Sequence, residues 1–405
     1  MFKIISIFIL IISLNISPVY SNDDKLNISV GTTFISNEIL GSYNGIKSQN
    51  KTNTNFNLAY KKKNLSSQLT LNFNDHNKLS FDNSFANYQI GAANINIGKI
   101  NRVWSFSDKS SLILSSNARP LNALSIEIKN KFNTQWLPPN AKWEIEIINA
   151  STKNSYNGKN SMLTGARAII SPSKRLSFEF LQTSQWGGED NNLSKSKLGA
   201  ILLSNTNNGE YANINKMAGF GLSYTIPINK STYRAYGQAI GEDEAGNLPS
   251  CYSWIAGIES LTSIVKVPTK LTFELIDTRV DTSTNRNCRE NAMYNNNTYE
   301  YINYNTVMGV PIDTEGNSLE LFGQSIINKN LDINYSIKFL SINDKDYAQH
   351  RLSSKRKLGK ITSFGIKWKK EGFNFGGNIS YQNMRLNKVH ISNGIILSLF
   401  TSIKF

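Results

Sequence analysis

Apolar and polar residues alternate along most of the chain with a period of two. The clearest sets span Leu69–Phe73, Leu124–Ile128, Trp143–Ile147, Phe220–Ile228 and Leu331–Phe339. Alternation of this kind places the apolar side chains on one face of a β-strand. Stretches rich in Asn, Ser, Gly and Lys separate the sets and are typical of turns and loops. The pattern therefore predicts an all-β protein with no long helix.

The last strand distinguishes a membrane barrel from a soluble β-sandwich, which has the same period. One face of this strand carries Ile395, Leu397, Leu399, Thr401, Ile403 and Phe405. An aromatic residue at the end of such a strand suits the girdle at a membrane interface. It also resembles the terminal signal that outer-membrane barrels present to their assembly machinery. We therefore predict a transmembrane antiparallel β-barrel of roughly 16 to 18 strands whose C-terminal strand ends in Phe405.

The first 21 residues have the pattern of a secretory signal peptide. Lys3 precedes the apolar run Ile4–Leu14, and the small residues Val19 and Ser21 suit a cleavage site after position 21. Eleven or so apolar residues are too few for a spanning helix, which needs roughly 20. We expect residues 22–405 to form the outer-membrane barrel. Strand-like sequence starts almost at once, which predicts no separate periplasmic helical bundle.

The net charge limits the classes of partner. The chain has 44 basic and 29 acidic residues, a formal charge of +15. Nucleic acid is an improbable partner for an exported protein, so we expect an acidic glycan, outer-membrane lipid or lipopolysaccharide instead. The alternative is that a Lys- and Asn-rich composition reflects genome bias alone.

The cysteine pair allows one covalent link. Cys251 and Cys288 both lie in polar, loop-like sequence, and the export route is oxidising. A disulfide would close a loop of about 37 residues (288 minus 251) and stabilise the fold by about 4 kcal/mol. Two unpaired thiols are the alternative.

Residues suited to catalysis or to binding a metal are sparse. The three histidines, His76, His350 and His390, are far apart, and none lies near a nucleophile signature. No His/Cys spacing suggests a metal site. We therefore expect no enzyme activity, no metal bound by His or Cys, and no cofactor.

Three stretches are more specific than barrel sequence in general. The first is Gly98–Pro120, GKINRVWSFSDKSSLILSSNARP. The second is Gln185–Gly188, QWGG, followed by KMAGFGLSYTIP from Lys216. The third is Tyr236–Ser250, YGQAIGEDEAGNLPS, followed by AGIE from Ala256. In order and spacing these stretches resemble the Wzi-type capsule assembly proteins, outer-membrane lectins of capsulated bacteria. The resemblance covers roughly residues 95 to 325.

The resemblance implies a non-catalytic, 18-stranded barrel with a blocked lumen. Such a barrel binds capsular polysaccharide at the cell surface and supports capsule assembly or attachment. A diffusion porin or polysaccharide exit channel remains the alternative function. The segment Tyr301–Asp313 also resembles the family, in a strand before a Gly-x-Pro-x-Asp turn.

The sequence departs from the family pattern in two places. The family has a helical bundle between the signal peptide and the barrel, and this sequence does not predict one. The sequence therefore does not decide whether the lumen is fully blocked. Ser105, Phe106 and Ser107 stand where the family has Gly-Pro-Gly, which predicts an altered turn beside Trp104.

The candidate site residues have two interpretations each. Glu242, Asp243 and Glu244 either hydrogen-bond sugar hydroxyls, bind a divalent cation, or pair with lumenal arginines. Trp104 and Trp186 either stack on sugar rings or fill the interior.

Three further candidates lie in the first motif. Arg102 and Arg119 hold either a uronate carboxylate or a lumenal acid. Asn117 belongs to a turn or to the same network.

Overall fold

The fold is that of a computed structural model of the 405-residue chain. The structure describes residues 24–41, 51–74, 78–133, 136–153, 160–187, 214–245, 248–280, 288–296 and 299–405. The predicted signal peptide, residues 1–21, lies outside these ranges.

Nearly all regular structure is β-strand. The strands are β1 (Asp24–Ile35), β2 (Thr52–Lys62), β3 (Leu65–Asn74), β4 (Leu79–Ser80), β5 (Phe85–Ile90), β6 (Ala93–Lys99), β7 (Asn122–Lys131), β8 (Lys142–Lys153), β9 (Asn160–Ser171), β10 (Leu176–Trp186), β11 (Asn215–Ile228), β12 (Ser231–Ala245), β13 (Leu248–Ile264), β14 (Val267–Asp277), β15 (Ile302–Asn303), β16 (Thr306–Val307), β17 (Asn317–Asn328), β18 (Leu331–Ile342), β19 (Lys357–Lys370), β20 (Phe373–Asn383) and β21 (Gly394–Lys404). No helix in the described ranges is long and apolar enough to cross a membrane.

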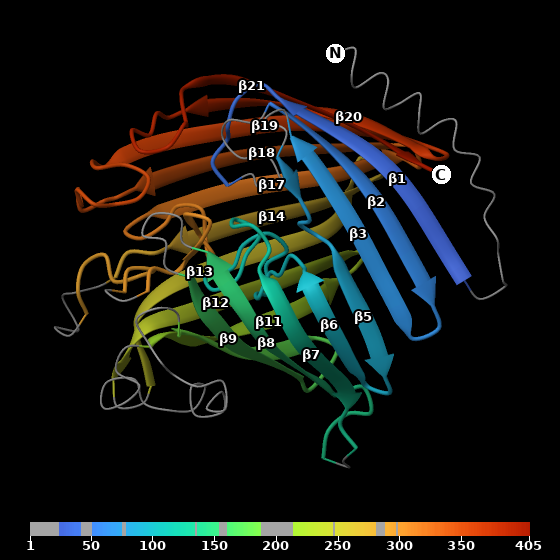
Figure 1. The fold of residues 1–405 in the computed structure, drawn as a ribbon, viewed down its shortest axis with the longest axis horizontal. Helices are drawn as coiled ribbons and strands as arrows, with labels where there is room; N and C mark the ends of the chain where they lie inside the picture. Colours follow the sequence, from blue (N-terminus) through green and yellow to red (C-terminus); the bar gives the residue numbers. More distant parts are fainter. Residues whose placement is uncertain are drawn as a thin grey trace.

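The strands form one closed antiparallel barrel. The sheet contains 19 strands, and the two-residue β4 pairs with β3 on the edge that β5 also uses. Leaving β4 out, the wall has 18 strands (19 minus 1), as the sequence predicts. β1 pairs with β21 from Ser29 opposite Lys404 to Ile35 opposite Ser398, which closes the barrel (Figure 1). The backbone N–H of Phe405 extends this pairing by donating to the carbonyl of Ile28 at 2.8 Å.

The alternating apolar residues form the outer face of the barrel. Phe220, Leu222 and Tyr224 on β11 are 47%, 45% and 43% exposed, and Ile145 and Ile147 on β8 face outward in the same way. A soluble protein would bury such rows, whereas a barrel presents them to lipid. The alternation predicted from the sequence is therefore confirmed, and its apolar residues lie on the membrane-facing side of the barrel.

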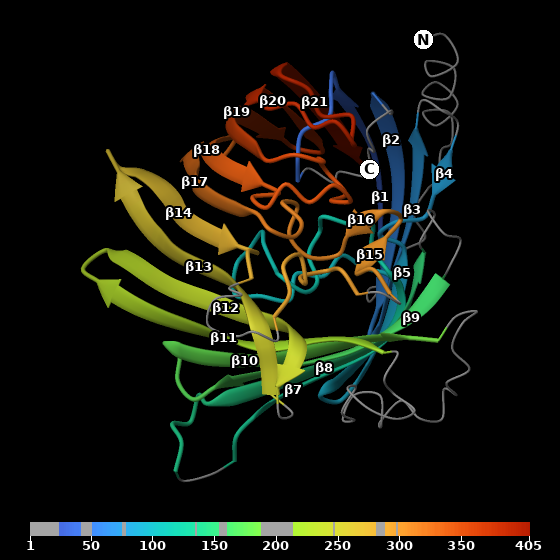
Figure 2. The same cartoon turned by 90° about the vertical axis from the view of Figure 1, so that its left-hand side faces the viewer.

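Long connections fold into the lumen. Viewed through the ring of strands, the connection between β6 and β7 and the connection between β14 and β17 occupy its centre (Figure 2). Their apolar residues form one buried cluster that includes Trp104, Leu112, Ile113, Tyr294 and Tyr301. The segment 301–313 was expected to be a strand. It contains only β15, β16 and irregular backbone, because it packs inside the barrel instead of joining the wall.

The disulfide links the wall to this interior. Cys251 on β13 is joined to Cys288 in the β14–β17 connection, with their Cα atoms 5.5 Å apart. Both cysteines are buried. The bond therefore ties one end of the inward connection to the barrel wall.

A charge on the outer face provides a test of the membrane-facing side. Leu222→Arg, near the middle of β11, should lower the free energy of unfolding in lipid vesicles by about 2–4 kcal/mol, because lipid cannot solvate a guanidinium. Urea titration measures the change. Val265→Arg is the control, since Val265 is 90% exposed in the turn between β13 and β14. Equal losses in the two variants would contradict the assignment.

Candidate functional site

The main structural feature of the lumen is the connection from residue 100 to residue 121, here called the inner segment. Trp104 and Leu114 lie at its centre, 1% and 4% exposed, and the backbone N–H of Trp104 donates to the carbonyl of Leu114 at 2.9 Å. Between them the side-chain hydroxyl of Ser111 donates to the carbonyl of Trp104 at 2.8 Å. These bonds fold the segment back on itself before it returns to β7.

The altered turn beside Trp104 uses hydroxyl groups in place of glycine. The backbone N–H of Ser107 donates to Oγ of Ser105 at 3.0 Å. None of Ser105, Phe106 and Ser107 has a positive φ, so the turn adopts a backbone conformation open to any residue. The departure from the family's Gly-Pro-Gly is thus compatible with an inward-folded segment.

Gln238 on β12 joins the first and third motifs directly. Its Nε2 donates to the carbonyl of Trp104 at 2.6 Å, and its Oε1 accepts the backbone N–H of Leu112 at 2.9 Å. Both atoms of one lumenal amide therefore satisfy backbone groups of the inner segment, which is what buried irregular backbone requires.

Glu146 on β8 holds two of the predicted site residues. Its Oε1 accepts from Nε of Arg102 at 2.8 Å, and its Oε2 accepts from the indole N–H of Trp104 at 2.8 Å. The ring of Trp104 lies against β9, where a Cβ on Gly165 would come within 3.0 Å of it. Neither face of this indole is open to a sugar ring, and Arg102 and Trp104 belong to an interior network.

Two wall arginines bind backbone carbonyls of the altered turn. Arg167 on β9 donates to the carbonyl of Ser105 at 3.0 Å and pairs with Glu179 at 2.6 Å. Arg234 on β12 donates to the carbonyl of Phe106 at 2.9 Å. Arg234 also pairs with the carboxylate of Glu259 at 3.0 Å. Each guanidinium therefore pairs with a lumenal carboxylate and also donates to a backbone carbonyl.

Glu274 on β14 accepts three hydroxyl groups. They belong to Ser107 at 2.5 Å, Ser110 at 2.6 Å and Tyr236 at 2.6 Å. Two of these donors come from the inner segment and one from β12. Hydrogen bonds to a carboxylate are stronger than those between neutral groups, so Glu274 is a strong anchor of the segment.

Arg119 lies at the far end of the inner segment. Its Nε and Nη2 donate to the two carboxylate oxygens of Asp82 at 2.7 and 2.9 Å, and Lys99 contacts the same carboxylate at 3.3 Å. The guanidinium also lies 4.2 Å from the ring centre of Tyr304. Arg119 thus joins the β4–β5 connection to the β14–β17 connection.

Trp186 and Asn117 occupy separate parts of the interior. Trp186 is 1% exposed on β10, and its indole N–H donates to the hydroxyl of Thr164 at 2.8 Å. Asn117 donates through Nδ2 to the carbonyl of Val307 at 2.9 Å. Both interactions link packed elements, and Trp186 offers no accessible face to a ligand.

The acidic cluster lies in the long β12–β13 hairpin. Glu242 accepts the backbone N–H of Tyr294 through Oε2 at 3.2 Å, so it contacts the β14–β17 connection. Asp243 and Glu244 pair through their backbones with Ser250 and Pro249, and their side chains lie outside the described set. Within the described residues, no group of three or more His, Cys, Asp or Glu is arranged to hold a metal ion.

A second polar cluster lies in the connections at the rim with the long loops. Arg351 donates to both oxygens of Asp313, at 2.8 Å through Nε and 2.5 Å through Nη2. Burial raises the pKa of the Asp313 carboxyl, but the Arg351 guanidinium outweighs it and holds that pKa below its usual range.

Burial lowers the pKa of the His350 imidazole in this cluster below its usual range, which favours the neutral form. Its Nε2 lies 3.0 Å from the carbonyl of Thr314, and its Nδ1 accepts the backbone N–H of Leu352 at 3.1 Å. This arrangement requires the tautomer with the proton on Nε2.

The sequence analysis missed the lumenal residues that bind the inner segment and the residues that form ion pairs with them. They are Asp82, Glu146, Arg167, Glu179, Gln238, Glu259 and Glu274. Their signal is a charged or amide residue on the polar face of an alternating strand, as at Glu146 between Ile145 and Ile147. That signal gives the lumenal side but not the residue that each group meets.

Fold and site together define an outer-membrane β-barrel whose centre is filled by its own connections. The model of the family described as capsule assembly protein Wzi matches residues 15–389. The chain belongs to this family. An uncharacterized 55.8 kDa protein in the cps region of Klebsiella pneumoniae is 28% identical over 194 residues, which cover 47% of this chain and 38% of that protein.

Solved structures share the architecture. The chain is similar to Wzi, an outer-membrane protein involved in group 1 capsule assembly in Escherichia coli and a carbohydrate-binding β-barrel. The TM-score is 0.78 at 19% identity, over 93% of this chain and 84% of that one. Pseudomonas aeruginosa OprD has a TM-score of 0.55 at 10% identity, over 95% and 96% of the two chains. At these identities the likeness concerns the fold.

Loss of the Glu274 carboxylate should loosen the inner segment. Glu274→Ala leaves three buried hydroxyl groups without their acceptor, at a cost of about 2–4 kcal/mol. Amide hydrogen exchange in residues 100–121 should accelerate markedly. The control is Glu290→Ala, which removes an exposed pair with Lys345 and should change exchange little. Unchanged exchange in Glu274→Ala would show that other bonds fix the segment.

Acidification should loosen the backbone around His350. The folded state keeps this imidazole neutral, so it binds fewer protons than the unfolded state, and stability falls as the pH drops below about 6.5. Protonation of Nδ1 also removes the acceptor of the Leu352 N–H. Hydrogen exchange of residues 350–353 should therefore accelerate between about pH 7.5 and about pH 5, after correction for intrinsic rates.

The control for this pH effect is His350→Gln, which keeps a donor and an acceptor but does not titrate. The neighbouring charged groups are Asp313, Arg351 and Lys388, and none of them has an ordinary pKa in that interval. An equal acceleration in His350→Gln would assign the effect to another group.

Proposed function

We propose that this protein binds capsular or other surface polysaccharide at the cell surface and supports the assembly or attachment of the capsule. The family to which the chain belongs and the carbohydrate binding of the similar Escherichia coli protein support this proposal. In it the polysaccharide is a ligand, so the protein needs no catalytic group and no cofactor.

One observation carries the proposal: wall side chains hold the inner segment across the lumen. Gln238, Glu146 and Glu274 each form hydrogen bonds with this segment, so the interior is built as a fixed scaffold. A scaffold of this kind holds the long connections at one rim in place, and rigid connections bind an extended ligand at a lower entropic cost.

Charge indicates the class of polysaccharide. The chain has a formal charge of +15, and the rim with the long connections carries exposed basic residues such as Lys355 and Arg356. Barrel rules place the longer connections outside the cell. We therefore propose an acidic polysaccharide as the ligand. We also propose that residues 1–21 direct export of the chain and are cleaved off after residue 21.

Binding of the host's own surface polysaccharide tests the function. Purified protein in nanodiscs should retain the polymer, with weaker retention at high salt because exposed ion pairs are screened. Lys355→Glu combined with Arg356→Glu should weaken retention at least about 10-fold, since two attractive charges become repulsive. Deletion of the gene should release capsule into the medium.

The matched control reverses two charges at the opposite rim. Lys230→Glu with Lys329→Glu lies in the short turns after β11 and β17 and should leave retention unchanged. Normal capsule attachment in the deletion strain, with no polymer retained by the pure protein, would contradict the proposal. A steady large conductance in a planar bilayer would favour the porin or exit channel instead.

A further inference from the structure

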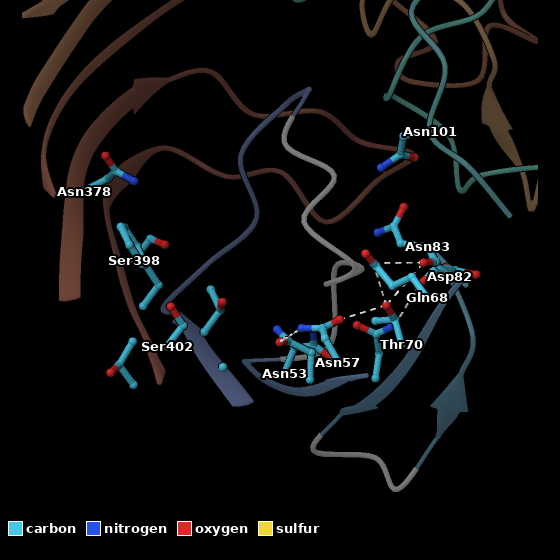
Figure 3. Close-up of a pocket in the computed structure, with 16 residues that line it drawn as sticks. Asn53, Asn57, Gln68, Thr70, Asp82, Asn83, Asn101, Asn378, Ser398 and Ser402 are labelled. Carbon is cyan, nitrogen blue, oxygen red and sulfur yellow. Dashed lines mark hydrogen bonds between the residues drawn. The ribbon is translucent and has the colours of Figure 1, made fainter. Parts of the chain in front are cut away.

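A cavity of about 620 Å³ lies between the inner segment and one side of the barrel wall. Its lining comes from β1, β2, β3, β20, β21 and the connection after β4 (Figure 3). The volume is in the range of pockets that hold small ligands. None of the candidate site residues that the sequence predicted lines this cavity.

The lining is polar but almost uncharged. Amides and hydroxyls predominate, with Asn57, Thr70 and Asn378 among those labelled in Figure 3. Asp82 is the one ionisable residue among the described residues that line it, and its carboxylate already pairs with Arg119 and Lys99. A charged ligand would find no available counter-ion here, whereas a ligand rich in hydroxyl groups would find donors and acceptors.

Lumen-facing side chains of β2 and β3 form a hydrogen-bonded row. The hydroxyl of Thr70 donates to Oδ1 of Asn57 at 2.8 Å, and Nε2 of Gln68 donates to that hydroxyl at 3.0 Å. Nδ2 of Asn57 continues the row to Oδ1 of Asn55 at 3.0 Å. These contacts fix the amide orientations before any ligand arrives, which lowers the entropic cost of binding.

Asn53 stands at the end of this row and is the exception. It is 3% exposed, it lines the cavity, and its Oδ1 has no hydrogen-bond partner in the described structure. A buried acceptor without a donor costs about 1–3 kcal/mol. A ligand hydroxyl group would remove this cost.

An apolar surface completes the lining. Phe400 turns inward from β21, and a Cβ on Gly376 would come within 2.3 Å of its ring, so the ring lies directly over β20. Sugar rings have apolar C–H faces beside their hydroxyl groups, and an aromatic ring complements such a face. Amides, hydroxyls and one aromatic ring together suit a neutral saccharide.

We propose that this cavity binds an uncharged, hydroxyl-rich segment of a glycan chain, with Asn53 accepting a hydrogen bond from a sugar hydroxyl. This inference rests on the proposed function and deepens it. The rim binds the acidic polymer by charge, and the cavity selects neutral sugar units within it.

The probe is a matched pair of short oligosaccharides. Fragments of the host's own surface polysaccharide are prepared with their carboxylates intact or reduced to alcohols. Thr33 lines the cavity and is half-buried, so Thr33→Cys places a thiol there. The native cysteines are joined in a disulfide and do not compete for maleimide. Reduced fragments should slow maleimide labelling of the new thiol, at concentrations at least about 10-fold lower than intact fragments require.

A second measurement separates binding from folding. Asn53→Leu keeps the size of the side chain and removes the unpaired acceptor, so thermal stability should stay equal or rise. Affinity for reduced fragments should fall about 10-fold, which corresponds to one lost hydrogen bond in a buried site. Gln324→Leu is the matched control, because Gln324 is a lumenal amide that lines a different cavity.

The outcomes distinguish the two proposals. If wild-type protein retains whole polymer but reduced fragments give no protection, the cavity inference is wrong and the proposed function stands. A loss of stability with unchanged affinity in Asn53→Leu would give Asn53 a structural role. If Asn53→Leu does not fold, Thr33→Trp, which fills the cavity, must abolish fragment binding. Failure to retain any polymer would remove the proposed function itself.

Discussion

The structure depends on satisfying irregular backbone inside a membrane barrel. Carbonyl and N–H groups of the inner segment lie buried inside the barrel, where leaving them without hydrogen-bond partners is costly. Gln238 forms hydrogen bonds with the backbone carbonyl of Trp104 and the backbone N–H of Leu112. Arg167 and Arg234 donate to backbone carbonyls of the turn that follows Trp104. The charged wall residues are therefore best understood as partners of the backbone, and their mutual ion pairs as the means of keeping them buried.

This requirement divides the barrel wall into two chemically different sides. The wall from β8 to β14 carries Glu146, Arg167, Glu179 and Glu274, and it is bonded closely to the inner segment. The wall made by β20, β21 and β1 to β3 carries neutral amides and hydroxyls and leaves the 620 Å³ cavity. Buried charged groups need fixed partners of opposite charge, whereas neutral amides and hydroxyls do not. The cavity can therefore lie beside the neutral side of the wall.

The sequence predicted the wall well and the interior only in part. Alternation depends on the two-residue period of a strand, so it found the outward rows such as Phe220–Ile228 and the pairing strand before Phe405. The motif residues Arg102, Trp104 and Arg119 were recognised, but their partners Glu146 and Asp82 were not. A lumenal position is a local property, whereas the group it meets depends on how a connection from elsewhere folds inward. The cavity was missed for the same reason, because its asparagines come from strands without a motif.

The two departures from the family pattern have different structural consequences. Ser107 stands where the resemblance to the family leads us to expect a glycine, and its hydroxyl gives Glu274 a donor that a glycine could not supply. Ser110 provides a second donor to the same carboxylate. The described residues from Asp24 onward contain strands but no helix, and within them the connections at the long-loop rim fold into the lumen. The segments at the barrel centre are therefore connections of the wall itself, and hydroxyl donors and lumenal acids hold them in place.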